Sequence, residues 1–392
     1  MEANRFESAL AQIAEHIRAA AAAQRPLCIQ GGGSKLFFGN AAVGDVLDVR
    51  DLRADPRHEP AELVVTVAAG TPLAELEALL AEAGQMLAFE PPRFGPAATV
   101  GGCVAAGLCG PRRIASGYAG GVLRDHVLGA KLLDGRGNLL SFGGTVIKNV
   151  AGYDVARLLA GSLGILGVIV EVSLKVVPRP ADEATVMLEC GMDEALRRCG
   201  DLGIEPWPVS ASAWIDGRLY LRLSGASAAV AAARRAIGGE TVTLRAADDL
   251  WLRLREQRLD FFELAADETL WRLSLPAGAP AGPGAGAASV GQGPLLFECH
   301  GMQRWLKTRH GGDAAVAGRF AADMRQAARR LGGHATRFRG DHVSGPAFEP
   351  LAPALLAIHQ RLKREFDPAC VFNRGRLQPQ IDDVSTPAGN PP

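Results

Sequence analysis

Three stretches rich in small residues lie within the first 170 positions of this 392-residue chain. They are GGGSK at 31–35, the segment from Thr99 to Gly107, and AGSLGILGVI at 160–169. Each alone is also typical of a tight turn or of close helix–strand packing. Three within one domain favour a long, extended ligand such as a dinucleotide, because backbone free of bulky side chains can approach phosphates closely.

The first stretch matches neither common nucleotide-binding motif. GxxxxGK[ST] does not occur in the chain, and no GxGxxG opens a helix after residue 35. Its backbone N–H groups can still form an anion-binding concavity, to which Lys35 adds a positive charge. In the second stretch, Thr99 is the expected N-cap of a short helix whose N-terminus faces a phosphate.

The bulk composition excludes several classes of function. Forty-two basic residues balance forty-two acidic ones, so there is no electrostatic reason to expect nucleic acid as a partner. No apolar run reaches the 18 residues of a membrane span, and the N-terminus does not read as a secretory signal. The seven cysteines include no CxxC pair, and no HxH or HExxH occurs. We therefore expect free thiols, no metal site and a cytoplasmic location.

Periodicity predicts an amphipathic helix at the N-terminus, where Phe6, Leu10, Ile13 and Ile17 share a face. Thr71 is the expected N-cap of a second helix over 72–83. Further on, Asp134-Gly135 predicts a hairpin turn, and the dense Val/Ile run at 165–180 predicts a strand buried on both faces. After Pro178 and Pro180 the order becomes β-α-β-β-α, which indicates a helix-covered antiparallel sheet. The Ala/Gly/Pro-rich segment 276–293 is expected to be a flexible surface loop.

Longer motifs carry a resemblance to a known family. GGGSK, TVGGCVAAGLCGPRR and the segment 124–180 resemble the FAD-binding half of the vanillyl-alcohol-oxidase/p-cresol-methylhydroxylase flavoprotein superfamily. KNVAGYD followed by GSLGILG is similar to its glycolate oxidase and D-lactate dehydrogenase branch. Together with GPRR, QRWLKT and FDPACVFNRGRL, the pattern resembles the family of FAD-binding E subunits of bacterial glycolate oxidase. The resemblance covers residues 25–180 strongly and 297–378 loosely.

The resemblance implies an α+β fold of four parts. These are an FAD-binding domain of two subdomains at 1–178, a cap-type domain with a helix-covered antiparallel sheet at 179–345, a C-terminal helix and segment returning to the FAD domain at 346–378, and a disordered tail at 379–392. FAD is expected to be non-covalent, since the first loop offers no histidine for attachment.

Carried over position by position, the resemblance also implies a set of cofactor-binding residues. Those expected at the pyrophosphate are Gly31, Gly32, Gly33, Ser34 and Lys35. Those expected beside the pyrophosphate and flavin are Thr99, Val100, Gly101, Gly102, Ala106 and Gly107. Gly167, Val168 and Ile169 are expected to offer backbone groups to the flavin or adenine, and Lys148, Asn149 and Asn373 to lie near the isoalloxazine.

The catalytic residues cannot be assigned from the sequence. Catalytic relatives carry a glycine-rich HxxDGNxH-type segment, of which this chain has only GGHAT at 332–336 and His342. His300, His310 and His334 are candidate bases, but we interpret each as a surface or locally hydrogen-bonded histidine. Arg304 and Arg339 are candidate carboxylate ligands, but we interpret both as solvated.

Three functions stay open. In the first, the chain is an oxidoreductase subunit that works only in a complex oxidising glycolate or another 2-hydroxy acid. A sister FAD-containing subunit performs catalysis, and an iron–sulfur subunit takes the electrons. The partner subunits give peripheral attachment at the inner membrane. In the second, the chain is a self-sufficient FAD-dependent glycolate or D-lactate dehydrogenase. In the third, it is a non-catalytic scaffold that kept the flavoprotein fold.

Overall fold

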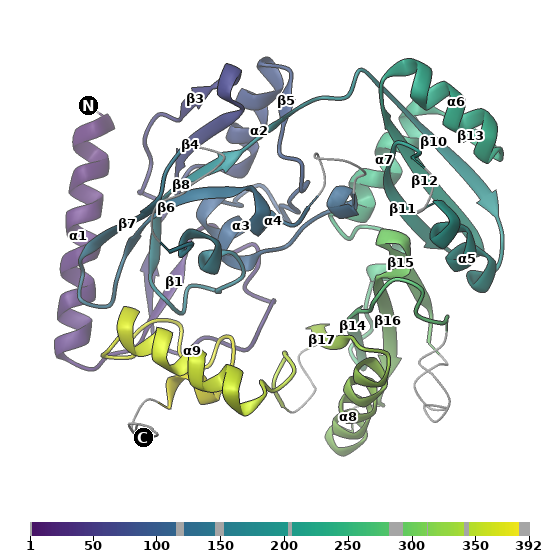
Figure 1. The fold of residues 1–392 in the computed structure, drawn as a ribbon. Helices are drawn as coiled ribbons and strands as arrows, with labels where there is room; N and C mark the ends of the chain where they lie inside the picture. Colours follow the sequence, from purple (N-terminus) through teal and green to yellow (C-terminus); the bar gives the residue numbers. More distant parts are fainter. Residues whose placement is uncertain are drawn as a thin grey trace, which may run out of the picture.

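Two antiparallel sheets of different size organise the chain into two bodies (Figure 1). The structure, a computed structural model, describes residues 2–114, 121–145, 153–202, 206–281, 293–311, 313–340 and 345–383. The first body contains the residues up to Pro178 and the C-terminal segment, and the second body contains the residues from Asp182 to Gly340. A linking segment joins β9 (Val177–Pro178) to the second body, and we propose Pro178 as the domain boundary.

The first body is built on a five-stranded sheet of order β3-β4-β8-β6-β7. Its central strand β8 is almost wholly buried, as the Val/Ile run predicts. Val168 and Val170 pack with the N-terminal helix α1, whereas Val172 and Leu174 pack with α2. The strands are β3 (Arg57–Glu59), β4 (Val64–Ala68), β6 (Val127–Leu133), β7 (Leu139–Gly143) and β8 (Val168–Lys175). The helices are α1 (Glu2–Ala22), α2 (Leu73–Glu82), α3 (Val100–Ala106) and α4 (Leu123–His126).

Two local predictions in this body have different outcomes. Strands β6 and β7 form the predicted hairpin, and the Asp134 carboxylate holds its turn by accepting hydrogen bonds from the backbone N–H groups of Arg136 and Asn138. Thr71, however, does not cap α2. Pro72 occupies the N-cap position, so Thr71 lies one residue too early, and its buried hydroxyl has no hydrogen-bond partner among the described residues.

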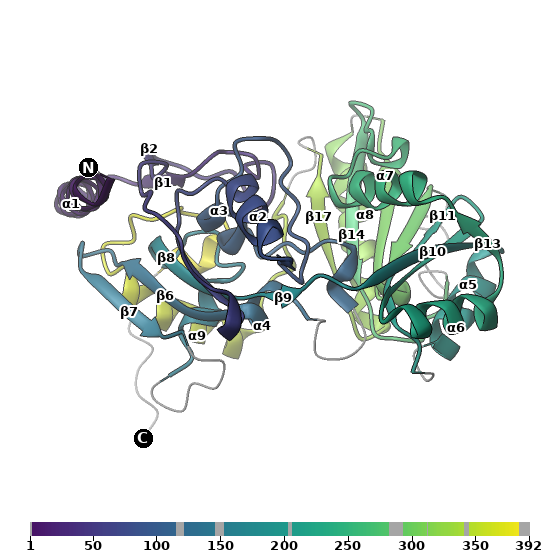
Figure 2. The same cartoon turned by 90° about the horizontal axis from the view of Figure 1, so that it is seen from above.

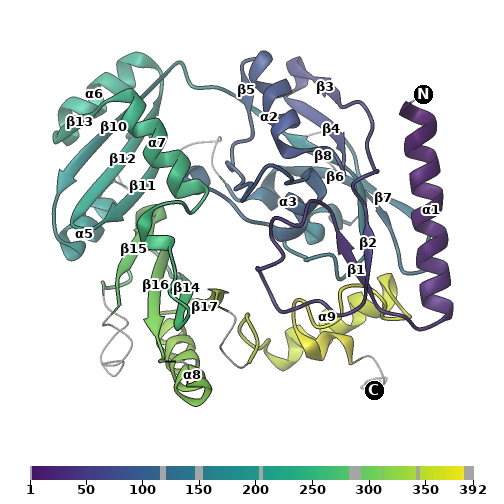
Figure 3. The same ribbon diagram turned by 180° about the vertical axis from the view of Figure 1, so that it is seen from behind.

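A small parallel pair, β1 (Leu27–Gln30) and β2 (Asp45–Asp48), lies between α1 and α3 (Figures 2 and 3). Strand β1 leads into the loop of residues 31–36, so the pair sets where the glycine-rich loop begins. A second pair joins β5 (Gln85–Met86) to β9.

The second body contains an eight-stranded sheet of order β13-β10-β12-β11-β15-β16-β14-β17. Helices α5 and α6 pack on Leu219, Leu221 and Leu223 of β12, while α7 packs on the opposite face, where Trp251 donates a hydrogen bond to Thr185. The strands are β10 (Asp182–Glu189), β11 (Val209–Ile215), β12 (Arg218–Gly225), β13 (Glu240–Val242), β14 (Glu268–Ser274), β15 (Leu295–Glu298), β16 (Gln303–Arg309) and β17 (His334–Arg339). The helices are α5 (Met192–Leu202), α6 (Ser227–Ile237), α7 (Leu244–Arg255) and α8 (Ala314–Arg330). The predicted β-α-β-β-α order and helix-covered sheet are confirmed.

The C-terminal segment returns to the first body, where α9 (Pro353–Phe366) lies (Figure 1). Lys363 is fully buried, pairs with Asp367 at 2.8 Å, and donates to the carbonyls of Ile165 and Phe372. The expectation of disorder from residue 379 onward is wrong for 379–383. A 3-10 helix spans Pro379–Asp382, and Ile381 is buried in the core of the first body. Residues 384–392 and most of the segment 276–293 lie outside the described residues.

The two bodies are packed together by an apolar cluster and by buried charges. Phe38 and Leu108 of the first body share a cluster with Trp305 and Phe338 of the second. Nearby, Glu90 accepts hydrogen bonds from Arg112 of its own body and from Arg222 of β12, both of which are buried. These contacts fix the sheet of the second body against the C-terminal end of α3.

None of the helices in the described ranges combines the length and apolar character that a membrane crossing requires.

Candidate cofactor-binding site

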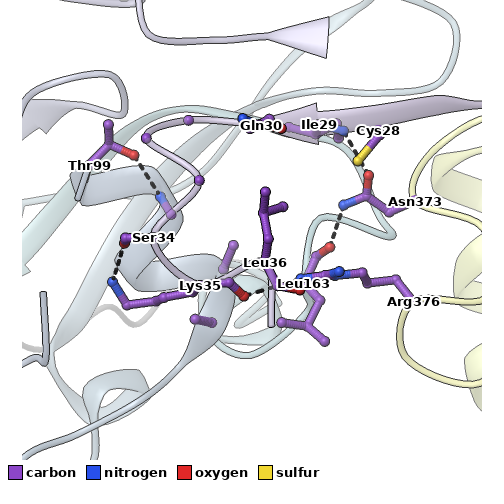
Figure 4. Close-up of a pocket in the computed structure, with 16 residues that line it drawn as sticks. Cys28, Ile29, Gln30, Ser34, Lys35, Leu36, Thr99, Leu163, Asn373 and Arg376 are labelled. Carbon is purple, nitrogen blue, oxygen red and sulfur yellow. Dashed lines mark hydrogen bonds between the residues drawn. The ribbon is translucent and has the colours of Figure 1, made fainter. Parts of the chain in front are cut away.

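A cavity lies in the first body, where segments far apart in the sequence meet (Figure 4). The walls come from the end of β1 and the loop after it, from α3, and from the C-terminal segment. The lining residues are Cys28, Ile29, Gln30, Gly31, Gly32, Gly33, Ser34, Lys35, Leu36, Thr99, Gly102, Ala105, Ala106, Leu163, Asn373 and Arg376.

The loop at residues 31–35 carries five consecutive backbone N–H groups that donate to no acceptor in the described part of the chain. These residues are half-buried and line the cavity, so their N–H groups are available to a ligand from outside the chain. Successive free N–H groups in a turn form the kind of concavity that binds phosphate oxygens. This is the strongest feature in the cavity that favours an anionic ligand.

Glycine is required in this loop by the approach of the chain to itself. A Cβ at Gly32 would lie 1.4 Å from the carbonyl oxygen of Ala97, so no side chain fits there. Gly33 has φ of +70°, a left-handed conformation that other residues rarely adopt. The glycines therefore hold the loop against the segment that precedes α3, while its N–H groups stay free.

The start of α3 behaves only partly as predicted. Thr99 is its N-cap and accepts a hydrogen bond from the N–H of Gly102 at 3.3 Å. The N–H groups of Val100 and Gly101, however, donate to the carbonyls of Thr71 and Ala69. Because these donors are already used within the protein, the helix N-terminus has little left to offer a phosphate. What α3 contributes to the cavity lining is the small residues Gly102, Ala105 and Ala106.

The side chain of Asn373 connects segments of the cavity wall through hydrogen bonds. Its Oδ1 accepts from the N–H of Ile29 at 2.7 Å, and its Nδ2 donates to the carbonyl of Leu163 at 2.5 Å. One acceptor site on the oxygen and one hydrogen on the nitrogen remain. Asn373 has φ of +42°, a region that asparagine tolerates better than most residues. Its side chain therefore joins β1, the third small-residue stretch and the C-terminal segment.

Two cations border the loop. The Nζ of Lys35 donates to the carbonyl of Arg93 at 3.2 Å, and burial lowers the pKa of this amine. Arg376 is buried and donates to the carbonyls of Lys35, Leu36 and Asn40, with no carboxylate within salt-bridge distance among the described residues. Burial lowers the pKa of this guanidinium too. An Arg without a carboxylate partner leaves net positive charge beside the free N–H groups.

About half of the cofactor-binding residues predicted from the sequence line the cavity. Those lining it are Gly31, Gly32, Gly33, Ser34, Lys35, Thr99, Gly102, Ala106 and Asn373. The seven residues that the sequence did not nominate are Cys28, Ile29, Gln30, Leu36, Ala105, Leu163 and Arg376. Of these, Leu163 lies inside a stretch already singled out, and Arg376 lies three positions after Asn373.

The other nominated residues lie elsewhere. Val100, Gly101 and Gly107 belong to α3 or its C-cap and are not part of the cavity lining. In the third stretch, Val168 and Ile169 pair with Leu133 and Leu132 of β6, and Gly167 packs against Leu133. None of the three lines this cavity, and their contact with the cofactor stays a prediction. Lys148 and Asn149 lie outside the described residues.

The candidate acid–base residues lie away from the cavity. His334 is exposed, which fits the interpretation of a surface histidine, and the backbone N–H of His300 donates to Ser212. His310 is neither exposed nor hydrogen-bonded through its ring within the described residues, so its interpretation was wrong. Arg304 is also not solvated, since it is buried and donates to the carbonyl of Gly301. Arg339 is half-buried, with its guanidinium 4.4 Å from the ring centroid of Phe37.

Comparison with known proteins identifies the family. A family model described as FAD binding domain matches residues 8–154. Glycolate oxidase subunit GlcE of Escherichia coli (strain K12) is 42% identical over 369 residues, which are 94% of this chain and 97% of that protein. The chain belongs to the glycolate oxidase subunit GlcE family. FAD is therefore its cofactor, and the chain is a flavoprotein of the oxidoreductase class.

Two more distant relatives and a solved structure also match the chain. Glycolate oxidase subunit GlcD of Bacillus subtilis (strain 168) is 30% identical over 181 residues, covering 45% of this chain and 37% of that protein. D-lactate dehydrogenase of Archaeoglobus fulgidus is 24% identical over 408 residues, covering 90% of this chain and 86% of that protein. A solved structure of alkyldihydroxyacetonephosphate synthase matches with a TM-score of 0.63 at 13% identity, covering 92% of this chain and 74% of that one. This last match shows the vanillyl-alcohol-oxidase type of fold alone.

The residues in the cavity fit an FAD molecule. Five free donors at 31–35 suit a pyrophosphate, and the unpaired charge of Arg376 adds to their field. Gly102, Ala105 and Ala106 line the cavity with small side chains, which leave room for the cofactor beside α3. The cavity thus combines an anion-binding end with a wall of small side chains.

Proposed function

We propose that this chain is the FAD-binding subunit of a multi-subunit complex that oxidises glycolate, a 2-hydroxy acid. In this proposal a sister FAD-containing subunit carries out catalysis, and this chain takes part in passing electrons from glycolate to an iron–sulfur subunit. The location is cytoplasmic, with attachment to the inner membrane through the partner subunits. Support comes from the 42% identity to glycolate oxidase subunit GlcE over nearly the whole of both chains.

The observation that carries the cofactor part of the proposal is the run of free N–H groups at 31–35. In the proposal these groups and Arg376 hold the pyrophosphate, and α3 supplies the wall beside the flavin. Asn373 keeps that wall in place by joining β1 to Leu163. When bound, FAD supplies the ability to accept a hydride and to pass on single electrons. We propose that binding is non-covalent, since the lining contains no histidine.

Two readouts test this proposal on the purified, tagged chain. Co-purification from its own cells should bring down a second flavoprotein and an iron–sulfur protein. The chain purified alone should carry bound FAD, and adding glycolate without oxygen should leave that FAD oxidised. Bleaching of the flavin by glycolate would instead identify a self-sufficient dehydrogenase. A colourless chain that also fails to bind added FAD would identify a scaffold subunit.

A further inference from the structure

The eight-stranded sheet of the second body is held together at its middle by only two residue pairs. Strands β11 and β15 pair at Ala213↔Glu298 and Trp214↔Phe297 and then separate. The sheet therefore consists of two four-stranded halves, β13-β10-β12-β11 and β15-β16-β14-β17 (Figure 1). A groove of about 700 Å³ opens where the halves part, between the end of β11 and the start of β15.

The lining of this groove is rich in large apolar side chains. Those that line it are Met192, Trp214, Ile215, Phe261, Leu295 and Leu306. All of them except Leu306 are only half-buried, so each keeps apolar surface in contact with water. Aromatic residues and Met are the apolar types that are enriched in protein–protein interfaces.

The two aromatic rings of the groove are held in place by the chain itself. The Trp214 ring stacks on Phe297 with the centroids 6.0 Å apart, and its Nε1 donates to the carbonyl of Cys190 at 2.9 Å. Phe261 packs edge-on against the buried Phe262, with the centroids 5.2 Å apart. Because both rings are fixed in advance, a partner that covers them loses little side-chain entropy on binding. Such preformed aromatic surface is typical of interface hot spots.

The border of the groove carries excess negative charge. Asp216 is exposed at the turn after β11 and has no cation within salt-bridge distance among the described residues. Arg253 is the one cation among the described lining residues, and Asp260, at 3.0 Å, already pairs with it. Lys307 lies nearby and is paired as well, with Glu268 at 4.0 Å. The free carboxylate of Asp216 therefore complements a Lys or Arg side chain of a partner.

Two occupants from this chain itself match the groove poorly. The groove is bordered by Ala281 and Gly293, and the chain between them, 282–292, has no charged residue and no apolar side chain larger than Val290. This segment offers neither a large apolar anchor nor a cation. A second copy that used the same surface would place Asp216 opposite another Asp216, and like charges in an interface repel.

We propose that this groove docks a partner protein, through a segment that carries a large apolar side chain beside a Lys or Arg. The inference rests on the proposed function for the identity of the partner, which is another subunit of the glycolate-oxidising complex. The groove shares no lining residue with the flavin cavity. Variants of the groove should therefore keep their FAD.

The test uses the full, tagged chain purified from its own cells lacking the untagged copy, with the other subunits quantified by mass spectrometry. Phe261→Arg removes an aromatic anchor and adds a charge that repels a basic segment. Asp216→Asn removes the free carboxylate, and asparagine tolerates the φ of +46° at this position. Leu355→Arg is the matched control, because Leu355 is an exposed apolar residue on α9 in the other body. Circular dichroism and FAD content show that each variant is folded.

We expect recovery of the partner subunit to fall at least tenfold in Phe261→Arg and to stay unchanged in Leu355→Arg. Asp216→Asn should recover less partner than the wild type at about 50 mM salt. At about 500 mM salt the two should recover equal amounts, because screening removes the contribution of the charge. This salt-dependent difference also decides the question if Phe261→Arg does not fold.

Full partner recovery by a folded Phe261→Arg, or equal recovery by Asp216→Asn at both salt concentrations, would overturn the inference. A lower molar mass of Phe261→Arg in light scattering, with full partner recovery, would place a second copy in the groove instead. Higher partner recovery after replacement of 282–292 by a Gly/Ser linker would place that segment there, and this would also overturn the inference. A wild-type chain that recovers no other subunit would refute the proposed function, and the docking site with it.

Discussion

Replacing Asn373 by alanine tests how the flavin cavity is held together. The change removes a hydrogen bond to the N–H of Ile29 and another to the carbonyl of Leu163. Both backbone groups would be left unpaired in a buried region, at about 1–3 kcal/mol each. Alanine would also have to adopt φ of +42°, at roughly 1 kcal/mol. We expect the free energy of unfolding to fall by at least about 3 kcal/mol.

The assay is urea unfolding followed by circular dichroism, with FAD content measured on the same samples. Asn138→Ala is the matched control, because Asn138 is exposed and its side chain makes only a 3.4 Å contact with Asp134. The control should change stability by less than about 0.5 kcal/mol, as surface substitutions usually do. Asn373→Ala should also retain less FAD, since the end of β1 and the position of Leu163 both depend on it. An Asn373→Ala protein within about 1 kcal/mol of the wild type and with full FAD would refute the reasoning.

Two further predictions concern other parts of the fold. Gly32→Ala should abolish FAD binding, because the added Cβ would clash with the carbonyl of Ala97. Gly84→Ala is the control, since Gly84 also has a positive φ, +66°, but has open space around it. The control should keep FAD, and its free energy of unfolding should fall by about 1 kcal/mol in the same urea assay. FAD retention in Gly32→Ala would show that the loop need not lie against Ala97. Burial alone would raise the pKa of Glu90, but the charges of Arg222 and Arg112 lower it from 4.5 to about 2. The stabilising charge of Glu90 is therefore present above about pH 4.5 and is lost as the pH falls to about 2. Glu90→Gln should be less stable than the wild type at pH 7. The difference in free energy of unfolding should shrink by about 3 kcal/mol between pH 4.5 and pH 2. A difference that does not change with pH would contradict this account.

Patterns within single segments predicted the fold well. The Val/Ile run identified β8, Asp134-Gly135 identified the β6–β7 hairpin, and Thr99 identified the cap of α3, because these features depend on neighbours in sequence. The prediction of Thr71 as an N-cap was wrong because Thr and Pro, which are both common where helices begin, are neighbours here. Pro72, not Thr71, occupies the N-cap position. Ile381 was assigned to a disordered tail because one apolar residue in a polar segment gives no periodicity.

The site could be predicted only where its residues follow one another. The loop at 31–35 is continuous, so the sequence located it and its donors. The used donors of Val100 and Gly101 depend on the carbonyls of Thr71 and Ala69, about 30 residues earlier, and no local pattern reveals such pairing. Arg376 was missed because its place in the cavity depends on the carbonyls of Lys35, Leu36 and Asn40, about 340 residues earlier.

The central claim is that the N–H groups of residues 31–35 bind the phosphates of FAD. Amide hydrogen exchange, measured by mass spectrometry on the flavin-free and FAD-loaded chain, tests it most directly. Without FAD these five amides should exchange fast, because they have no acceptor within the described protein; with FAD they should exchange at least tenfold more slowly. The amides of β8, which are paired within the sheet, should exchange slowly in both states. Equal exchange at 31–35 with and without bound FAD would contradict the account.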